Sequence, residues 1–97
     1  MKVPAVYIMA SKRNGTLYTG VTSDLVRRVW QHRTGAVGGF TKRYHCDLLV
    51  WYEIGGDMEG AIHREKQIKA GSRARKLALI EAMNPEWRDL WDDIAHP

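Results

Sequence analysis

One carboxylate in the sequence falls in the middle of an apolar helix face. The apolar stripe predicted for residues 57–71 consists of Met58, Ala61, Ile62 and Ile68. Glu65 lies at its centre, three or four residues from most of these neighbours. An isolated buried charge is very costly, so this carboxylate requires neutralisation, cationic hydrogen-bond donors or a metal ion. The pattern leaves a structural salt bridge and a ligand or catalytic role equally open.

Two tyrosines flank a glycine on one face of a predicted β-hairpin. Residues 3–10 and 16–21 show period-2 alternation and flank Asn14-Gly15, a strong hairpin turn signal. The alternation predicts a core face made of Val6, Ile8, Leu17 and Val21. It predicts that the opposite face carries Tyr7, Met9, Tyr18 and Gly20.

The glycine marks this second face as a candidate site. If Asn14-Gly15 forms a two-residue turn, Met9 faces Gly20 and Ser11 faces Tyr18. The tyrosines alone indicate little, because tyrosine forms strands well and its hydroxyl can reach water. A glycine inside a strand weakens it, and it is often found where a ligand or another backbone approaches closely.

The helix predicted after the hairpin carries two polar residues at the border of its apolar side. Ser23-Asp24 offers an N-cap, and the helix ends near Gly35. Its apolar side consists of Leu25, Val26, Val29 and Trp30. Arg28 and His32 lie together on one border and can lean over the hairpin, whereas Arg27 points to solvent. Border arginines also cover apolar surface with their stems, so a structural role is equally open.

Composition and charge narrow the class of protein. The chain has 97 residues, of which 44% are hydrophobic and 27% charged, which predicts one globular domain spanning residues 1–97. Residues 1–76 carry 14 Lys and Arg against six Asp and Glu, and residues 77–97 carry one against five. A basic region of this size favours a polyanionic partner, most often nucleic acid, over a merely solvated surface.

The sequence also predicts the compartment. Its apolar runs are far shorter than the roughly 20 residues of a membrane span, and its first residues form no signal-peptide core. The single cysteine, Cys46, permits no internal disulfide and no multi-cysteine zinc site. We therefore expect a cytoplasmic monomer that does not bind membranes, with Cys46 as a core thiol.

The remaining elements complete an α+β fold. A flexible glycine-rich stretch over residues 35–39 precedes a third strand over residues 48–54. Three further helices are predicted over residues 57–71, 72–83 and 84–94. Gly71 is expected as a C′ glycine and Asn84 as the N-cap of the last helix. The predicted architecture is a small antiparallel three-stranded sheet flanked by helices, in the order ββαβααα.

The ordered set of these residues resembles the GIY-YIG nuclease domain. The matching residues are Tyr7-Ile8, Tyr18-Thr19-Gly20, Asp24-Leu25, Arg28, His32, Arg64-Glu65 and Asn84. The resemblance is closest to small stand-alone members, whose pattern includes residues 40–44 (FTKRY) and 65–69 (EKQIK). The first motif departs from the family, since Ala5-Val6-Tyr7 replaces Gly-Ile-Tyr. Because the tyrosine is kept, we expect this change to affect strand packing more than mechanism.

The resemblance implies a divalent-metal-dependent endonuclease that hydrolyses DNA phosphodiester bonds, with repair or recombination as the process. It implies four catalytic residues, Tyr7, Tyr18, Arg28 and His32. Glu65 is the implied ligand of one Mg²⁺ or Mn²⁺, a hard cation for which one carboxylate suffices because it keeps most of its waters. Gly20 and Asn84 are the implied supporting residues. A tyrosine can accept a proton from water only if cations or hydrogen bonds lower its pKa from about 10, and Arg28 and the metal are expected to do so.

Basic residues outside this set are the predicted contacts to the nucleic-acid backbone, with DNA as the favoured partner. They are Arg27, Lys42, Arg43, Lys66, Lys69, Arg73 and Lys76. Two alternatives remain. The first is a catalytically inactive nucleic-acid-binding module on the same fold. The second is a structural subunit that docks through Trp87, Trp91 and Ile94, which explains the acidic C-terminal residues but leaves Glu65 unexplained.

Overall fold

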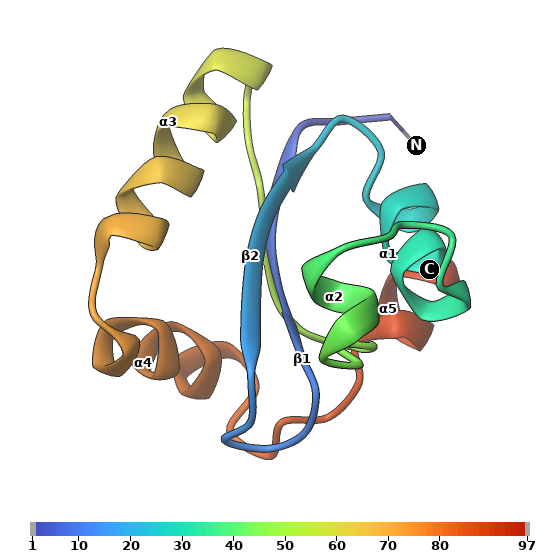
Figure 1. Cartoon of the computed structure of the whole chain (residues 1–97). Coiled ribbons are helices and arrows are strands. Elements are labelled where there is room, and N and C mark those ends of the chain that lie inside the picture. Colours follow the sequence, from blue (N-terminus) through green and yellow to red (C-terminus); the bar gives the residue numbers. More distant parts are fainter. Residues whose placement is uncertain (1, 97) are drawn as a thin grey trace.

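A three-stranded antiparallel sheet lies between two layers of helices. The computed structural model describes residues 2–96. The strands are β1 (Ala5–Ala10), β2 (Leu17–Thr22) and β3 (Leu48–Ile54), in the spatial order β2-β1-β3. The helices are α1 (Leu25–Thr34), α2 (Phe40–Arg43), α3 (Met58–Ala70), α4 (Arg73–Met83) and α5 (Trp91–Ala95). In Figure 1, α3 and α4 lie on one side of the sheet, and α1, α2 and α5 lie on the other.

The predicted α+β class is confirmed, as is the antiparallel three-stranded sheet flanked by helices. The order ββαβααα holds with one addition, because the four-residue helix α2 follows the glycine-rich stretch. Strand β1 is central and β3 is an edge strand. Within residues 2–96, no helix is both long enough and apolar enough to cross a lipid bilayer.

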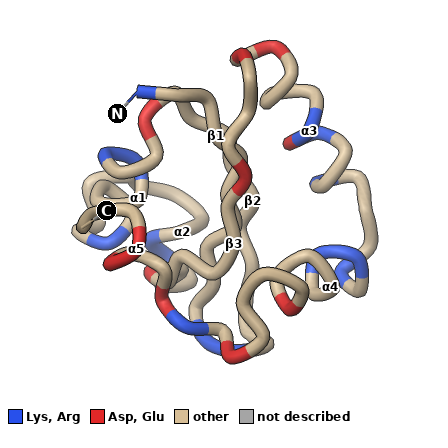
Figure 2. Tube along the Cα trace, turned by 180° about the vertical axis from the view of Figure 1, so that it is seen from behind, with Lys and Arg blue, Asp and Glu red and all other residues tan. Residues whose placement is uncertain are grey.

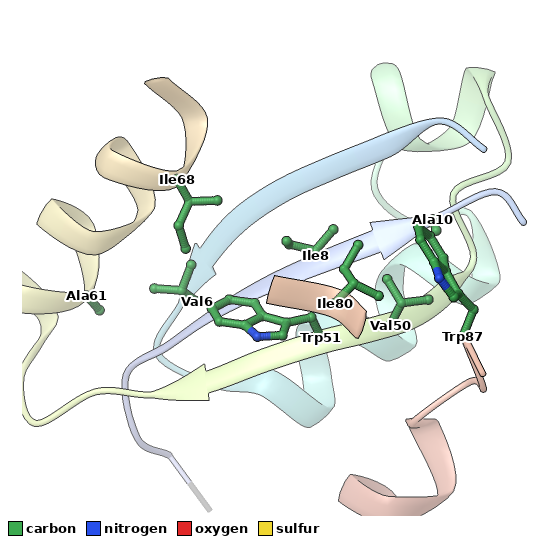
Figure 3. Close-up of a cluster of buried hydrophobic side chains, with 9 residues drawn as sticks. All are labelled: Val6, Ile8, Ala10, Val50, Trp51, Ala61, Ile68, Ile80 and Trp87. Atoms are coloured by element: carbon green, nitrogen blue, oxygen red, sulfur yellow. The ribbon is translucent and has the colours of Figure 1, made fainter. Parts of the chain in front are cut away.

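Strand β1 is buried on both of its faces. Val6, Ile8 and Ala10 point into a core that α3 and α4 complete, as Figure 3 shows. Tyr7 and Met9 point into a second core beneath α1. The predicted division of the hairpin into two faces is therefore correct, but the face assigned to Tyr7 is as deeply buried as the face assigned to Val6.

The hairpin register differs from the predicted one. Tyr7 pairs with Gly20 and Met9 pairs with Tyr18, so the partners are shifted by two residues. The connection is a four-residue loop, in which Gly15 N–H donates to Lys12 O at 2.9 Å. The guanidinium of Arg73 donates to the carbonyls of Asn14 and Gly15 and so fixes the longer loop.

The buried stripes of two helices are narrower than predicted. On α1 the buried residues are Leu25, Val29 and His32, and Trp30 is 53% exposed. On α3 only Ala61 and Ile68 are buried, and Met58 and Ile62 are exposed. The stripe of α1 turns toward His32 because this histidine has polar partners inside the fold. Helix α3 ends at Ala70, so the predicted stop at Gly71 is correct, but Gly71 has φ −75° and lacks the positive φ typical of a C′ glycine.

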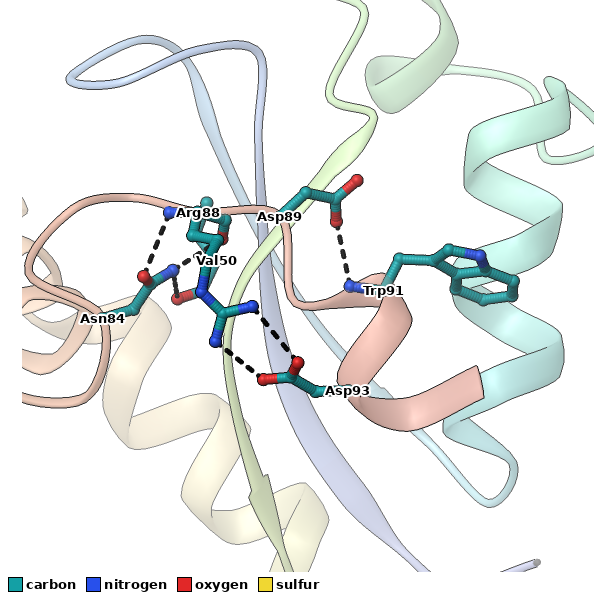
Figure 4. A network of polar contacts seen from close by, with 6 residues as sticks. All are labelled: Val50, Asn84, Arg88, Asp89, Trp91 and Asp93. Atoms are coloured by element: carbon teal, nitrogen blue, oxygen red, sulfur yellow. Dashed lines mark hydrogen bonds and ion pairs between the residues drawn. The ribbon is translucent and has the colours of Figure 1, made fainter. Parts of the chain in front are cut away.

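The C-terminal helix is shorter than predicted. Asn84 ends α4 instead of beginning a new helix, and α5 starts only at Trp91. The side chain of Asn84 holds the intervening segment, since its Nδ2 donates to Val50 O and Arg88 O, and its Oδ1 accepts from Arg88 N–H (Figure 4). These bonds use the amide for a tight turn, which is why the helix does not continue.

The two tryptophans expected to dock a partner have internal contacts. Trp87 is buried in the core on the α3 and α4 side. Trp91 is half-buried, and the guanidinium of Arg33 lies 5.2 Å from the centre of its ring. Asp89 pairs with Arg33 and accepts hydrogen bonds from the backbone of Leu49 and Trp91. The C-terminal tryptophans and part of the acidic charge therefore serve the fold.

Candidate active site

The side chain of Tyr7 crosses directly over Gly20 on the neighbouring strand. A Cβ atom added to Gly20 would lie 2.5 Å from both the Oη and the Cζ of Tyr7. No side chain larger than hydrogen fits there unless the tyrosine moves. The predicted close approach at Gly20 is thus real, and what approaches is the phenol of Tyr7 itself.

The hydroxyl of Tyr7 belongs to a buried chain of hydrogen bonds. Its Oη lies 2.8 Å from Nε2 of His32, and Nδ1 of His32 lies 3.0 Å from Oγ1 of Thr41. All three side chains are buried. The chain joins β1, α1 and α2, and it orients the imidazole through both of its ring nitrogens.

Burial sets the protonation states of this chain. Burial and then the positive charge of Arg28 lower the pKa of His32 from 6.5 to about 4, against a smaller opposing effect of Asp47. Burial also raises the pKa of Tyr7 above its ordinary value, and the charges of Tyr18 and Glu65 act in the same direction. Arg28 lowers this pKa, as expected from the sequence, but burial outweighs it. At neutral pH, Tyr7 is therefore protonated and His32 is neutral.

Arg28 is half-buried beside this chain, and Arg27 is exposed. Arg28 lies one helical turn before His32 on α1, and its positive charge lowers the pKa of both Tyr7 and His32. The predicted difference in direction between the two neighbouring arginines is therefore confirmed.

Glu65 reaches the same region from the other helical layer. Its side chain is 12% exposed, and Oε2 lies 2.9 Å from Nζ of Lys69, one turn later on α3. Nζ of Lys69 also lies 5.9 Å from the centre of the Tyr18 ring. Strand β2 is an edge strand, so α3 can bring Glu65 and Lys69 around it to the tyrosine side of the sheet.

These residues match a known domain. The family model described as the GIY-YIG catalytic domain matches residues 3–78. The chain belongs to the GIY-YIG family. It is 42% identical over 82 residues to a UPF0213 protein of Syntrophus aciditrophicus, which covers 84% of this chain and 92% of that protein. It is 38% identical over 76 residues to a UPF0213 protein of Staphylococcus haemolyticus, covering 78% of this chain and 92% of that one.

The fold also matches a solved structure. The solution NMR structure of a UPF0213 protein from Bacillus halodurans superposes with a TM-score of 0.56 and 27% sequence identity. The match covers 92% of this chain and 94% of the other. Both comparisons support the resemblance read from the ordered motifs.

At the candidate site, one carboxylate could hold a divalent ion. Within residues 2–96, no cluster of three or more His, Cys, Asp and Glu side chains is arranged to hold a metal. Glu65 offers a largely buried carboxylate on which a cation, the ammonium of Lys69, already lies. A hard cation that keeps several waters and shares phosphate oxygens needs no more from the protein. Lys69 would have to leave the carboxylate, and its side chain is exposed enough (49%) to do so.

The predicted supporting and nucleic-acid-binding residues are found in different settings. Asn84 has the loop-holding bonds described above, and its contacts among the described residues explain its burial. Arg73 is bound to the hairpin loop. The others that are exposed are Arg27, Lys42, Arg43, Lys66 and the Glu65-paired Lys69, and Lys76 is half-buried. Figure 2 shows that Lys and Arg positions occur in both helical layers, so no single basic face stands out.

Thr41 completes the hydrogen-bond chain of His32, and the sequence alone indicates no role for it. The sequence also indicates no helix over residues 40–43 and no separate function for Phe40, which lies next to Tyr18, or for Tyr44, which lies next to Phe40. A signal was available, because the FTKRY segment was already part of the resemblance. The residue types and spacing of this segment do not indicate a chemical role, because the role of Thr41 depends on its contact with His32, which only the folded structure shows.

Proposed function

We propose that the protein is a divalent-metal-dependent endonuclease that hydrolyses phosphodiester bonds of DNA as a monomer. The observation that supports this most directly is the buried hydrogen bond of 2.8 Å between Tyr7 and His32, with Arg28 beside both. A structural core has no need of a buried tyrosine-histidine pair next to a guanidinium. Membership of the GIY-YIG family supports the same chemistry.

In the proposed reaction, Tyr7 and His32 move a proton together. Tyr7 is protonated at neutral pH, so it cannot remove a proton from water alone. If Nδ1–H of His32 donates to Thr41, Nε2 is free to accept the hydroxyl proton of Tyr7. The oxygen of Tyr7 then takes the proton of the attacking water while its own proton passes to His32.

Arg28 connects phosphate binding to this proton transfer. Its guanidinium can pair with the phosphate and with the negative charge that grows on it in the transition state. Pairing also offsets the charge that helps to lower the pKa of His32. A bound phosphate therefore makes His32 a better proton acceptor at the moment when it is needed.

Glu65 would hold the divalent ion. When bound, the ion supplies Lewis-acid stabilisation of the phosphate oxygens and of the leaving oxygen. Lys69, once displaced from Glu65, remains next to Tyr18 and can contact the substrate backbone.

A catalytically inactive nucleic-acid-binding module is the second candidate. The observation in its favour is the ion pair between Glu65 and Lys69, which satisfies the carboxylate without a metal. If Glu65 has only a structural role, its ion pair with Lys69 is the interaction that this role requires.

Cleavage of single-stranded, duplex and branched DNA with Mg²⁺, with Mn²⁺ and with EDTA separates the two candidates. We expect metal-dependent cleavage by the unmodified protein. Glu65→Ala should abolish both cleavage and Mn²⁺ binding measured by calorimetry, while DNA binding in EDTA is kept. Lys69→Ala is the matched control, because it breaks the same ion pair but leaves the carboxylate. Equal loss of thermal stability in both variants, without metal binding in any form of the protein, would favour the inactive module.

A further inference from the structure

Helix α2 presents two exposed aromatic side chains next to the candidate active site. Phe40 is 45% exposed and Tyr44 is 43% exposed, and their ring centres are 4.7 Å apart. Neither residue belongs to the two buried cores. The two rings are tilted by 43° to each other. The pair therefore adds little to folding and leaves aromatic surface open to a ligand.

These rings extend an aromatic row that begins at the buried hydrogen-bond chain. The Phe40 ring lies 6.1 Å from the ring of Tyr18, which lies 5.5 Å from His32 and 6.4 Å from Tyr7. Exposure rises along this row, from the fully buried Tyr7 to Phe40 and Tyr44 at its outer end. A ligand on the outer rings would thus lie next to the groups proposed to act on phosphate.

Thr41 fixes the position of α2 relative to that chemistry. Its hydroxyl contacts Nδ1 of His32, and its carbonyl accepts a hydrogen bond from Cys46 N–H at 2.9 Å. Because Thr41 stands between Phe40 and the basic pair Lys42-Arg43, one buried contact holds all of them in place.

The positively charged side chains beside the aromatic row favour an anionic ligand. The guanidinium of Arg43 lies 5.5 Å from the centre of the Tyr44 ring, and Lys69 lies over Tyr18. The segment from Ala36 to Cys46 contains no Asp or Glu. A ligand that fits aromatic rings beside cations has flat faces and negative charges. Single-stranded nucleic acid has both, because its bases are flat and its backbone carries phosphates.

We propose that Phe40 and Tyr44 are a stacking platform for unpaired nucleobases, which makes single-stranded segments the preferred substrate. The proposal rests on the nuclease function proposed above for the position of the adjoining phosphate at Tyr7 and Arg28. In a duplex, each base face is already covered by its neighbours, so only unpaired bases can stack on the platform. The backbone of the same strand contacts Lys42 and Arg43.

The test is equilibrium binding in EDTA, measured by fluorescence anisotropy on four labelled ligands of equal length. These are oligothymidine, oligouridine, a duplex, and an abasic deoxyribose-phosphate strand that has the charge but no bases. The unmodified protein should bind oligothymidine more tightly than the duplex. Phe40→Ala or Tyr44→Ala should weaken oligothymidine binding roughly 5-fold to 100-fold, the loss expected for one stacked base, and should leave abasic binding within about twofold. The oligouridine arm shows whether the sugar is also selected.

Two further variants make the test specific. Trp30→Ala removes an equally exposed aromatic ring from α1 and should leave all four affinities unchanged. Phe40→Leu keeps an apolar side chain against Tyr18 but removes the aromatic face, so it should lose oligothymidine binding as Phe40→Ala does. Full binding by Phe40→Leu, an equal loss on the abasic strand, or equal affinity for duplex and oligothymidine would overturn the platform.

The outcome is independent of turnover. If the protein binds oligothymidine through Phe40 but cleaves no DNA with Mn²⁺, the stacking platform is supported and the proposed nuclease function is overturned. A protein that cleaves but is indifferent to both aromatic substitutions keeps the nuclease function and loses the platform.

Discussion

The two faces of the sheet are equally buried but chemically different. On the side of α3 and α4, strand β1 contributes Val6 and Ile8 to a cluster of hydrophobic side chains that contains no buried hydroxyl or imidazole. On the side of α1, the same strand contributes Tyr7, which is hydrogen-bonded to His32. Apolar side chains need only close packing, whereas a buried hydroxyl and imidazole need partners that satisfy them. Burial alone therefore does not distinguish the core from the candidate site. The buried hydrogen bonds of Tyr7 and His32 distinguish them.

The largest effect should come from Arg28, on the polar face. Arg28→Ala should lower the single-turnover cleavage rate by orders of magnitude with little change in DNA affinity, because the guanidinium meets charge that develops in the transition state. Arg27→Ala, at the next position but exposed, should reduce affinity modestly and leave the chemical step alone. Rates at saturating protein and binding constants on one labelled DNA distinguish the two variants. A damaging Arg27→Ala with a mild Arg28→Ala would move the active face to the other side of α1.

Substitutions at Gly20 and Val21 test the two faces of the sheet separately, because these neighbouring residues of β2 point to opposite faces. Gly20→Ala inserts a methyl group 2.5 Å from the Tyr7 hydroxyl and should displace it, with a loss of about 1–3 kcal/mol in stability and a cleavage rate lower by roughly 100-fold. Val21→Ala removes packing from the apolar face and should lower the free energy of unfolding while the rate per folded molecule stays unchanged. Denaturant unfolding and single-turnover rates measure both quantities. A Gly20→Ala protein with normal cleavage would show that the position of the Tyr7 hydroxyl is unimportant.

The division of the hairpin into two faces was predictable because period-2 alternation depends only on backbone geometry. Its register was not, because the Asn14-Gly15 signal does not reveal the contacts from Arg73 that stabilise a four-residue loop. The exposure of Trp30 was missed for a related reason. The burial of His32 rotates the inner face of α1, and that burial depends on Tyr7 and Thr41, which lie far away in the sequence.

Acid should destabilise the protein through the polar face. The pKa of His32 is about 4 in the fold and 6.5 ordinarily, so below pH 6.5 the unfolded chain binds a proton that the folded chain does not. This contribution to stability is complete above pH 6.5 and is lost progressively as the pH falls toward 4, by roughly 1–3 kcal/mol. His32→Gln keeps a polar side chain without titration, and it should flatten this part of the profile in urea unfolding measured across the pH range. An unchanged slope in His32→Gln would assign the acid sensitivity to another group.

The smallest effect concerns which layer contacts the DNA backbone. Each phosphate contact adds roughly 0.7 to 0.9 to the slope of log K against log salt. Replacing Lys42 and Arg43 together by Gln should flatten that slope by one to two such steps, because they accompany the proposed stacking platform. Replacing Lys66 and Lys76 on α3 and α4 should flatten it less. The reverse order, measured by salt titrations of affinity, would place the backbone across the other helical layer.

The residues of the candidate site were easier to predict from the sequence than their burial and protonation states. Tyr7, His32, Arg28 and Glu65 follow from the ordered motifs, and the structure brings them to the β2 edge of the sheet. Arg28 lowers the pKa of Tyr7 as expected, but the net shift is upward, because burial under the packed helices outweighs the charge of Arg28. Chain spacing contains no information on that burial. Helix α2 escaped prediction because four residues are too short to show helical periodicity.

The most direct test of the account is the single-turnover cleavage rate of Tyr7→Phe with Mg²⁺ or Mn²⁺. The substitution keeps the ring over Gly20 and removes only the hydroxyl that bonds to His32. If that hydroxyl transfers the proton of the attacking water, cleavage should fall by roughly 10²-fold to 10⁴-fold. Thermal stability should fall by only about 1 kcal/mol, and DNA binding should be unchanged. A folded Tyr7→Phe protein that cleaves at the rate of the unmodified protein would contradict the account.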